Sequence, residues 1–397
     1  MSRTRVVVST GVHAVGSLLP QLVGLATLEA ADYGHFSALY LTYVLGISVV
    51  FSTVCDAWIV TARTGGQLAR WPDYGNALAW VALLCGAAVA VVAELTTLDP
   101  AVTAIAGVGA ALMVYYDGGR FFQAHSDRWR RVLAGDFMVV VGFLAGWAAG
   151  YLTHQHGLLS LLLAWAGGAA GGTLGVVRPV VGHPARVRDW MVQHHHAIKT
   201  LIADATMMNV GSIGTPYLLF FPMSLHQFGL YRAVSNVSAP ARLVLSPLRP
   251  VIAGMTRARL HSVPLVGAVL GGAAFFGTAA ALALMWIELI PLPLGVISEI
   301  GPYAVPAGLY VAGNVIGEFY YMVVRFHTGR ASLWSGRLVE TVLAVLGPVL
   351  GWLVGGLSGA IWGYAVATMV FGVVWMWIGL HSTRGADAPL GARRARG

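Results

Sequence analysis

Charged residues are scarce in this chain of 397 residues, in which Asp, Glu, Lys and Arg make up 10% and hydrophobic residues 57%. A soluble domain carries about a quarter charged residues, so this composition excludes a water-soluble globular fold. The mean hydropathy is +0.73. Long unbroken apolar runs stand where a spanning β-barrel would alternate polar and apolar positions. The composition therefore predicts an all-α integral membrane protein.

Cysteine is also rare, since only Cys55 and Cys85 occur and both lie in apolar runs. This excludes a disulfide framework and a cysteine-rich metal site. The phosphate-cradling motif Gly-x4-Gly-Lys-Ser/Thr is missing, so the chain does not hydrolyse nucleotide by that route. Three adjacent histidines, 194–196, do not share a helix face and predict a solvated linker. We expect no metal, no cofactor and no catalytic residue, and hence no enzyme.

Apolar runs bounded by charges, proline or glycine clusters number twelve. A membrane-spanning helix needs roughly 20 mostly apolar residues, and each run is near that length. The expected spans are 6–27, 36–60, 77–94, 99–117, 132–152, 157–178, 199–221, 227–249, 264–287, 300–324, 338–355 and 358–381.

The connections between these runs differ in charge. Even-numbered connections and both termini collect Lys and Arg, whereas odd-numbered connections carry none and hold acids such as Glu29, Glu94 and Glu288. Cytoplasmic loops are rich in Lys and Arg, so this alternation predicts twelve spans with both termini in the cytoplasm. The net charge of +8 is then a sign of topology, and no nucleic-acid partner is expected.

Two short segments recur at an offset of 195 residues. Val15-Gly16-Ser17 returns at 210–212, and the segment 33–38 (YGHFSA) returns at 228–233 (FGLYRA). The repeat predicts two six-helix lobes related by a pseudo-two-fold axis along the membrane normal; chance similarity of Gly-rich segments is the alternative. The expected parts are a first lobe (1–178), a cytoplasmic interfacial linker (179–198), a second lobe (199–381) and a basic tail (382–397).

The eighth run is the least apolar. At about 100° per residue its polar side chains share an arc of about 140°, and they include the substrate-binding candidates Arg232, Ser235, Asn236 and Arg242. An arginine facing lipid at mid-membrane costs at least ~2.5 kcal/mol, so this face is expected to line a cleft between the lobes. Guanidinium suits phosphate, which favours an anionic lipid headgroup. Alternatively, each arginine neutralises an acid of the other lobe.

A second polar stripe lies in the tenth run, where Tyr310, Asn314, Glu318, Tyr321 and Arg325 follow one another at spacings of three or four. Tyr310 and Asn314 are further substrate-binding candidates. Glu318 is expected inside the membrane, where a carboxylate must be paired, protonated or ion-bound. It is either an ion-coupling residue or a structural partner of Tyr or Arg.

Two other ionisable residues, His13 and Asp204, are ion-coupling candidates on helices expected to face the cleft. A structural hydrogen-bonding role is the alternative for both. The remaining acids near the cytoplasmic ends of helices are expected to be solvated or ion-paired, and these are Asp56, Asp117, Asp136 and Glu340.

Two stretches resemble a known family: LEAADYGHFSALYLTYVLG at 28–46 and FGLYRAVSNVSAPARLVLSPLRPVI at 228–252. They are similar to the multidrug/oligosaccharidyl-lipid/polysaccharide (MOP) flippase superfamily, in particular its polysaccharide-biosynthesis (Wzx-type) branch. The resemblance implies movement of a lipid-(pyro)phosphate-linked oligosaccharide from the inner to the outer leaflet of a bacterial cytoplasmic membrane by alternating access. It implies as partners this lipid-linked glycan, membrane lipids and glycan-assembly machinery.

Two other functions stay open. A cation-coupled multidrug exporter of the same superfamily would place carboxylates in the cavity, as Asp204 and Glu318 permit. A membrane glycosyltransferase or polymerase would use acids such as Glu29 and Asp32, but it needs a sizeable outer loop, and every expected outer connection is short.

Overall fold

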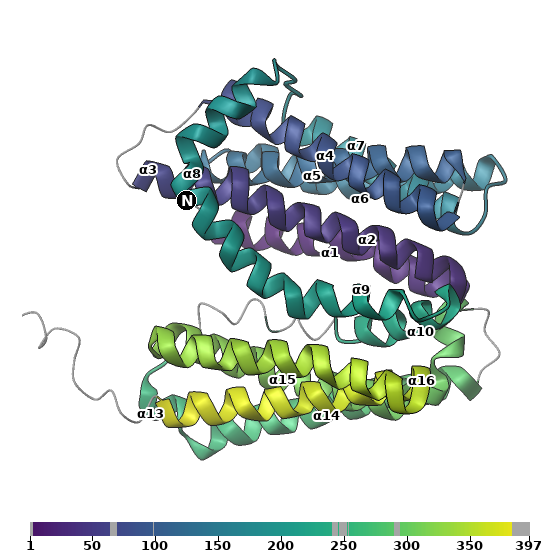
Figure 1. Ribbon diagram of the computed structural model, residues 1–397, viewed down its shortest axis with the longest axis vertical. Coiled ribbons are helices and arrows are strands. Elements are labelled where there is room, and N and C mark those ends of the chain that lie inside the picture. The colour runs from purple at the N-terminus through teal and green to yellow at the C-terminus, as the bar shows by residue number, and fades with distance from the viewer. Residues whose placement is uncertain are drawn as a thin grey trace, which may run out of the picture. The chain divides into compact units, whose positions relative to one another are not determined.

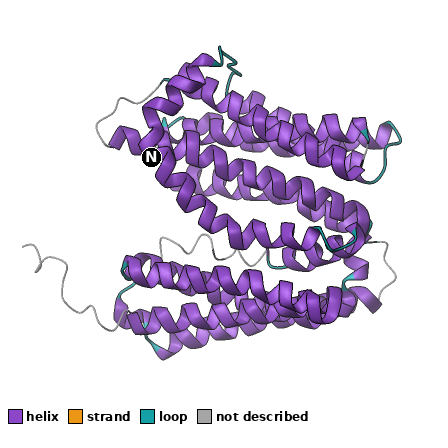
Figure 2. Ribbon diagram, viewed as in Figure 1, coloured by secondary structure: helices purple, strands orange, loops and turns teal. Residues whose placement is uncertain are grey.

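The computed structural model describes residues 3–63, 70–97, 99–239, 245, 252, 254–289 and 294–382, and within these ranges it contains helices and loops and no strand (Figure 2). Seven helical segments of this part are long and apolar enough to cross a membrane. One of the seven is α16, although Gly355 and Gly356 leave helical geometry in its middle. The all-α membrane fold agrees with the sequence, while the number of twelve spans stays a prediction.

The chain forms two compact units, each treated by itself. Unit 1 comprises Met1–Asn209 with Leu294–Val296, and unit 2 comprises Val210–Pro293 with Ile297–Gly397. Unit 1 therefore includes the segment expected as a separate linker. The expected boundary between linker and seventh span, at 198/199, falls inside a continuous helix.

Unit 1 is a bundle in which α4 to α7 run beside one another and α2 packs against α4 (Figure 1). Its helices are α1 (Arg3–Thr27), α2 (Ala30–Val50), the π-helical turn η1 (Phe51–Cys55), α3 (Asp56–Arg63), α4 (Trp71–Thr97), α5 (Pro100–His125), α6 (Trp129–Leu152), α7 (Leu158–Val176) and α8 (Ala185–Asn209).

The tightest packing in unit 1 is between α6 and α7. A Cβ on Gly142 would lie 2.3 Å from the carbonyl oxygen of Gly167, so the backbones approach as only small residues allow.

Unit 2 packs α15 between α14 and α16. Its helices are the π-helical turn η2 (Val210–Gly214), α9 (Thr215–Phe220), α10 (Leu225–Asn236), α13 (Arg257–Leu260), α14 (Val263–Leu289), α15 (Ala304–His327) and α16 (Arg330–Ser382). Two short 3-10 turns are η4 (Gly295–Glu299) and η5 (Gly301–Tyr303). The first two residues of η4 belong to unit 1. The core of unit 2 joins Phe319 and Tyr320 of α15 with Trp375 of α16.

The second repeated segment, 33–38 and 228–233, lies in the first turns of α2 and α10, which begin at the same offset of 195 residues. The first repeated segment, 15–17 and 210–212, lies inside α1 and in the turn η2. Helix α2 begins at Ala30 after the cap residue Glu29, and α10 begins at Leu225 after the cap residue Ser224. In each helix the repeated residues turn inward, since Tyr33 and Phe228 are both fully buried. The second segment of the repeat thus coincides with like local structure; the two-fold relation between lobes stays a prediction.

Candidate functional site

Helix α10 carries the first predicted site residues, and a capping box fixes its start. The Ser224 hydroxyl accepts a hydrogen bond from the Gln227 backbone N–H (3.3 Å), and the Gln227 side chain accepts one from the Ser224 N–H (3.1 Å). This exchange satisfies two of the free N–H groups of a helix N-terminus. His226 adds a contact to Glu299 at 2.8 Å. Helix α10 ends at Asn236, and most of the remainder of the expected span 227–249 lies outside the described residues.

Arg232 is half-buried on α10, and no counter-charge for it is found among the described residues. Its Nη1 donates to the Ser235 hydroxyl at 3.2 Å, and that hydroxyl donates to the Arg232 carbonyl at 2.9 Å. Its Nε is buried without a hydrogen-bond partner. Within the described ranges, no carboxylate forms an ion pair with Arg232. A guanidinium has five donors, and among the described residues only Ser235 accepts a hydrogen bond from this one.

The other predicted residues of the same face are only partly described. Ser235 is buried beside Arg232, and Asn236 is half-buried at the end of α10. Arg242 lies outside the described residues, so its predicted place on this face is not tested.

Tyr310 and Asn314 lie together in the interior of unit 2. Asn314 is buried and its Nδ2 donates to the Tyr310 carbonyl at 3.0 Å. The Tyr310 ring stacks on Tyr364 with centroids 4.7 Å apart, and their hydroxyl oxygens are 3.2 Å apart. The ring centroid of Tyr364 also lies 5.7 Å from that of Tyr231, the residue that precedes Arg232 in the chain. The structure thus brings the two predicted polar stripes together through Tyr364, a residue without any signal in its apolar surroundings in the sequence.

Glu318 lies near a charged cluster that joins α15 to α16. It is within electrostatic reach of Arg337 and Glu340, which form an ion pair at 3.0 Å. Glu340 also accepts a hydrogen bond from the Trp375 indole N–H at 3.1 Å, and the Arg337 guanidinium lies 4.1 Å from the centroid of the Tyr321 ring. The ion-paired role expected for Glu340 is confirmed, and Arg337 is the partner that the sequence did not identify.

The ion-coupling candidate His13 borders a buried polar cluster of unit 1. At its centre is Asp136, which is 0% exposed and forms an ion pair with Arg120. The Arg120 Nε is 2.7 Å from Oδ1 of Asp136, and the Arg120 Nη2 is 3.3 Å from Oδ2. Ser9 and Tyr116 also donate hydroxyl hydrogen bonds to its two oxygens. Asp136 is therefore ion-paired, one of the two roles expected for it from the sequence.

The position of His13 follows from this cluster. Its Nδ1 is 3.4 Å from the Tyr116 hydroxyl oxygen and 3.8 Å from Asp136. Because the Tyr116 hydrogen is used toward Asp136, Nδ1 of His13 carries the hydrogen in this contact. Next to the cluster, Asp117 is half-buried and accepts a hydrogen bond from the Tyr43 hydroxyl at 2.8 Å. The third candidate, Asp204, is part of α8, but its side chain is outside the described residues.

The histidine run on α8 differs from the expected solvated linker. His194 is buried and stacks on Trp190 with centroids 4.0 Å apart, while His195 and His196 are exposed. The run thus points to two sides of the helix, as its spacing predicts. Among the side chains that the structure describes, no group of three or more His, Cys, Asp and Glu residues could hold a metal ion.

Comparison with known proteins gives a clear result for the fold. No family model matches the sequence, and no curated protein matches it. Among solved structures, the chain is similar to a multidrug resistance MATE family transporter of the MOP superfamily in an inward-facing conformation, with a TM-score of 0.60, 11% identity and coverage of 96% of this chain and 99% of that one.

The chain is also similar to the lipid II flippase MurJ in an inward closed conformation, with a TM-score of 0.56, 10% identity and coverage of 96% of this chain and 87% of that one. These likenesses do not single out the polysaccharide-biosynthesis branch. The chain therefore shares its fold with these two solved membrane proteins.

Proposed function

We propose that the chain is a membrane transporter that moves a lipid-(pyro)phosphate-linked oligosaccharide from the inner to the outer leaflet, for the biosynthesis of a cell-surface polysaccharide. Its fold supports transport, since one protein of like fold is a drug transporter and another is a lipid II flippase. The proposal includes twelve spans in two lobes of six and both termini in the cytoplasm of a bacterium. Glycan-assembly machinery would supply the substrate.

Arg232 is the observation that carries the choice of an anionic substrate. Burying a charge without a partner costs free energy, and a protein would otherwise place an acid beside this guanidinium. A phosphate oxygen beside Arg232 would take the donors that Ser235 does not use. Hydrogen bonds that involve a charged group contribute about 1.5–3 kcal/mol each, so one such contact changes affinity about 10-fold to 100-fold.

The neighbouring polar groups complete the proposed site. Ser235 orients the Arg232 guanidinium, and Asn236 and Arg242 extend the polar face toward further phosphate or sugar hydroxyls. Tyr310 and Asn314 support this region from α15, because Tyr364 links their helix to Tyr231.

A cation-coupled multidrug exporter is the second candidate, and two observations favour it. One protein of like fold is a multidrug transporter, and Glu318 is a half-buried carboxylate whose neighbour Arg337 pairs directly with Glu340 instead. Under either function His13, Asp204 and Glu318 are the proposed ion-coupling residues. Replacing Glu318 with Gln tests coupling, and transport with an unchanged dependence on pH and Na+ would contradict this role.

The experiment that tests the proposed function uses the purified full-length chain in proteoliposomes. The substrate is a fluorescent, short-chain polyprenyl-pyrophosphate-linked saccharide, and its arrival in the opposite leaflet is measured by accessibility to a membrane-impermeant quencher. We expect Arg232→Ala to reduce transport at least 10-fold and Arg232→Lys to retain part of it. The matched control is Arg325→Ala, which removes an exposed arginine of unit 2 that contacts Tyr321 at 3.1 Å.

Two outcomes would overturn the proposal. In the first, Arg232→Ala transports the glycolipid at the wild-type rate while it inserts normally. In the second, the wild-type protein moves a lipophilic organic cation in the same vesicles and leaves the glycolipid in place, which would establish the exporter instead.

A further inference from the structure

Helix α8 presents a stripe of basic residues that unit 1 does not use. Arg188, Val192, His195 and Lys199 follow one another at spacings of four, three and four, and all are exposed. Residues at such spacings share one face of a helix. We name these four residues the basic stripe.

The opposite face of α8 determines the direction in which the basic stripe points. Trp190, His194 and Ile198 are spaced by four residues and are buried in unit 1. The Trp190 indole N–H donates to the Thr53 carbonyl at 3.0 Å, and the Asn209 side chain donates to the Ser48 hydroxyl at 2.7 Å. With both ends of the helix held, the basic stripe faces away from unit 1.

The segment that precedes α8 lies along the first turns of α4, which opens a membrane span. The indole N–H groups of Trp71 and Trp80 donate to the carbonyls of Arg178 (3.3 Å) and Gly182 (3.1 Å), and the Asn76 side chain accepts from the Gly182 N–H at 2.7 Å. Tryptophan is enriched where the membrane meets water. A membrane boundary beside these two tryptophans would set the start of α8 among the lipid headgroups.

The charges of α8 are not arranged for the stability of the helix itself. Its first turn holds Arg186 and Arg188 and no acid, although the macrodipole favours acids at a helix N-terminus. Asp189 is the only acid among the exposed side chains described on α8. Val192, in the middle of the basic stripe, is 64% exposed, and an apolar side chain between cations suits the boundary of headgroups and acyl chains.

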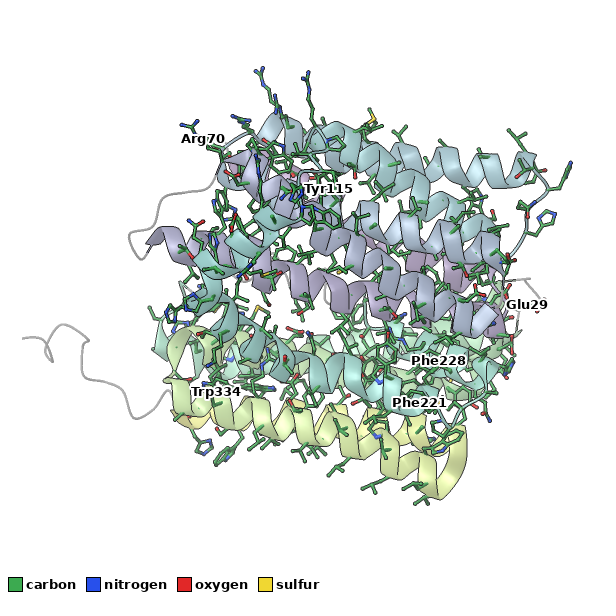
Figure 3. The ribbon with its side chains drawn as sticks, turned by 45° about the horizontal axis from the view of Figure 1, so that its top comes forward. Glu29, Arg70, Tyr115, Phe221, Phe228 and Trp334 are labelled. Carbon is green, nitrogen blue, oxygen red and sulfur yellow. The ribbon has the colours of Figure 1, made fainter. Side chains whose placement is uncertain are left out.

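We infer that the basic stripe is a docking surface for anionic phospholipid headgroups of the surrounding leaflet. The phosphate groups would bind Arg188 and Lys199, and Val192 would lie against the upper acyl chains. The inference does not depend on the transported substrate, because the four residues of the basic stripe all belong to α8 of unit 1. Arg70 lies at one end of unit 1 and Glu29 lies at the other (Figure 3).

The test measures lipid binding by the full-length protein in neutral detergent. Phosphatidylglycerol or phosphatidylcholine is titrated, and retained lipid is counted by native mass spectrometry. We expect the wild type to prefer phosphatidylglycerol. A cation near a lipid surface contributes about 1 kcal/mol, so Arg188→Gln with Lys199→Gln should weaken phosphatidylglycerol binding about fivefold for each cation removed, and Asp189→Asn should strengthen it.

The matched control is Arg130→Gln with Arg131→Gln, which removes two exposed cations from the first turn of α6. If this control weakens binding as much as the stripe variant, the preference reflects net charge and the inference is wrong. Equal binding of the two lipids by the wild type, or full displacement of phosphatidylglycerol by inorganic phosphate at the same concentration, would also overturn it.

Discussion

The ion pair between Asp136 and Arg120 allows a quantitative prediction about the stability of unit 1. Asp136 is 0% exposed and Arg120 is 18% exposed, and the carboxylate also accepts hydrogen bonds from Ser9 and Tyr116. Removing one partner of a buried pair costs about 3–5 kcal/mol because the other charge stays buried and unpaired. We therefore expect Asp136→Leu to destabilise the protein by this amount.

The magnitude can be measured as a melting temperature. For a unit of about 200 residues, each kcal/mol corresponds to about 2–4 °C, so Asp136→Leu should lower the melting temperature of the detergent-solubilised protein by about 6 °C or more. Size-exclusion chromatography of heated samples measures this shift. The control is Asp127→Asn at the exposed turn between α5 and α6, where a surface substitution should change stability by at most about 0.5 kcal/mol.

A double mutant tests the physical reason. Replacing both charges with apolar groups of similar volume leaves no unpaired charge and is often neutral or better. Asp136→Leu combined with Arg120→Met should therefore be more stable than Asp136→Leu alone. If the two substitutions add, or if Asp136→Leu melts at the same temperature as Asp127→Asn, the pair does not stabilise unit 1 as argued.

Two further predictions concern packing and pH. A Cβ on Gly351 would lie 2.0 Å from the Gly359 carbonyl oxygen, so Gly351→Leu should separate the two parts of α16 and cost at least about 1–3 kcal/mol; an unchanged melting temperature would contradict this. Burial lowers the pKa of His194, so the unfolded chain binds a proton at this residue more readily than the folded chain does. The free energy of unfolding should therefore fall as the pH drops below about 6.5. His194→Phe keeps an aromatic ring stacked on Trp190, and it should make the melting temperature less dependent on pH in this range. If the variant and the wild type lose the same melting temperature as the pH falls, His194 does not have this role.

The sequence predicts those features that depend on residues close together in the chain. The repeat locates the starts of α2 and α10, and the helical spacing of Arg232 and Ser235 predicts the contact that their side chains make. The spacing of three residues suffices, because neighbours on a helix face meet whatever the rest of the fold does.

Features that depend on long-range contacts could not be predicted in this way. The span expected at 36–60 changes to a π-helical turn at Phe51–Cys55, and the carbonyl of Thr53 in that turn binds Trp190, 137 residues away. Likewise, Ser9 is 127 residues from Asp136. No period of the sequence connects such positions, so the buried ion pair of unit 1 and the docking of α8 became visible only in the structure.

Compensated and uncompensated charges have different physical meanings in this molecule. Asp136 is matched by Arg120 and two hydroxyl groups, all in unit 1, so its environment is complete without a ligand, and we expect its loss to appear as lost stability. Arg232 has a buried Nε without a partner among the described residues, and an added anion would complete its environment. Its removal should leave the melting temperature nearly unchanged and reduce transport at least 10-fold. A variant that lost both together would show that Arg232 stabilises unit 2 through a contact of its own, and the case for an anionic substrate would lose its main support.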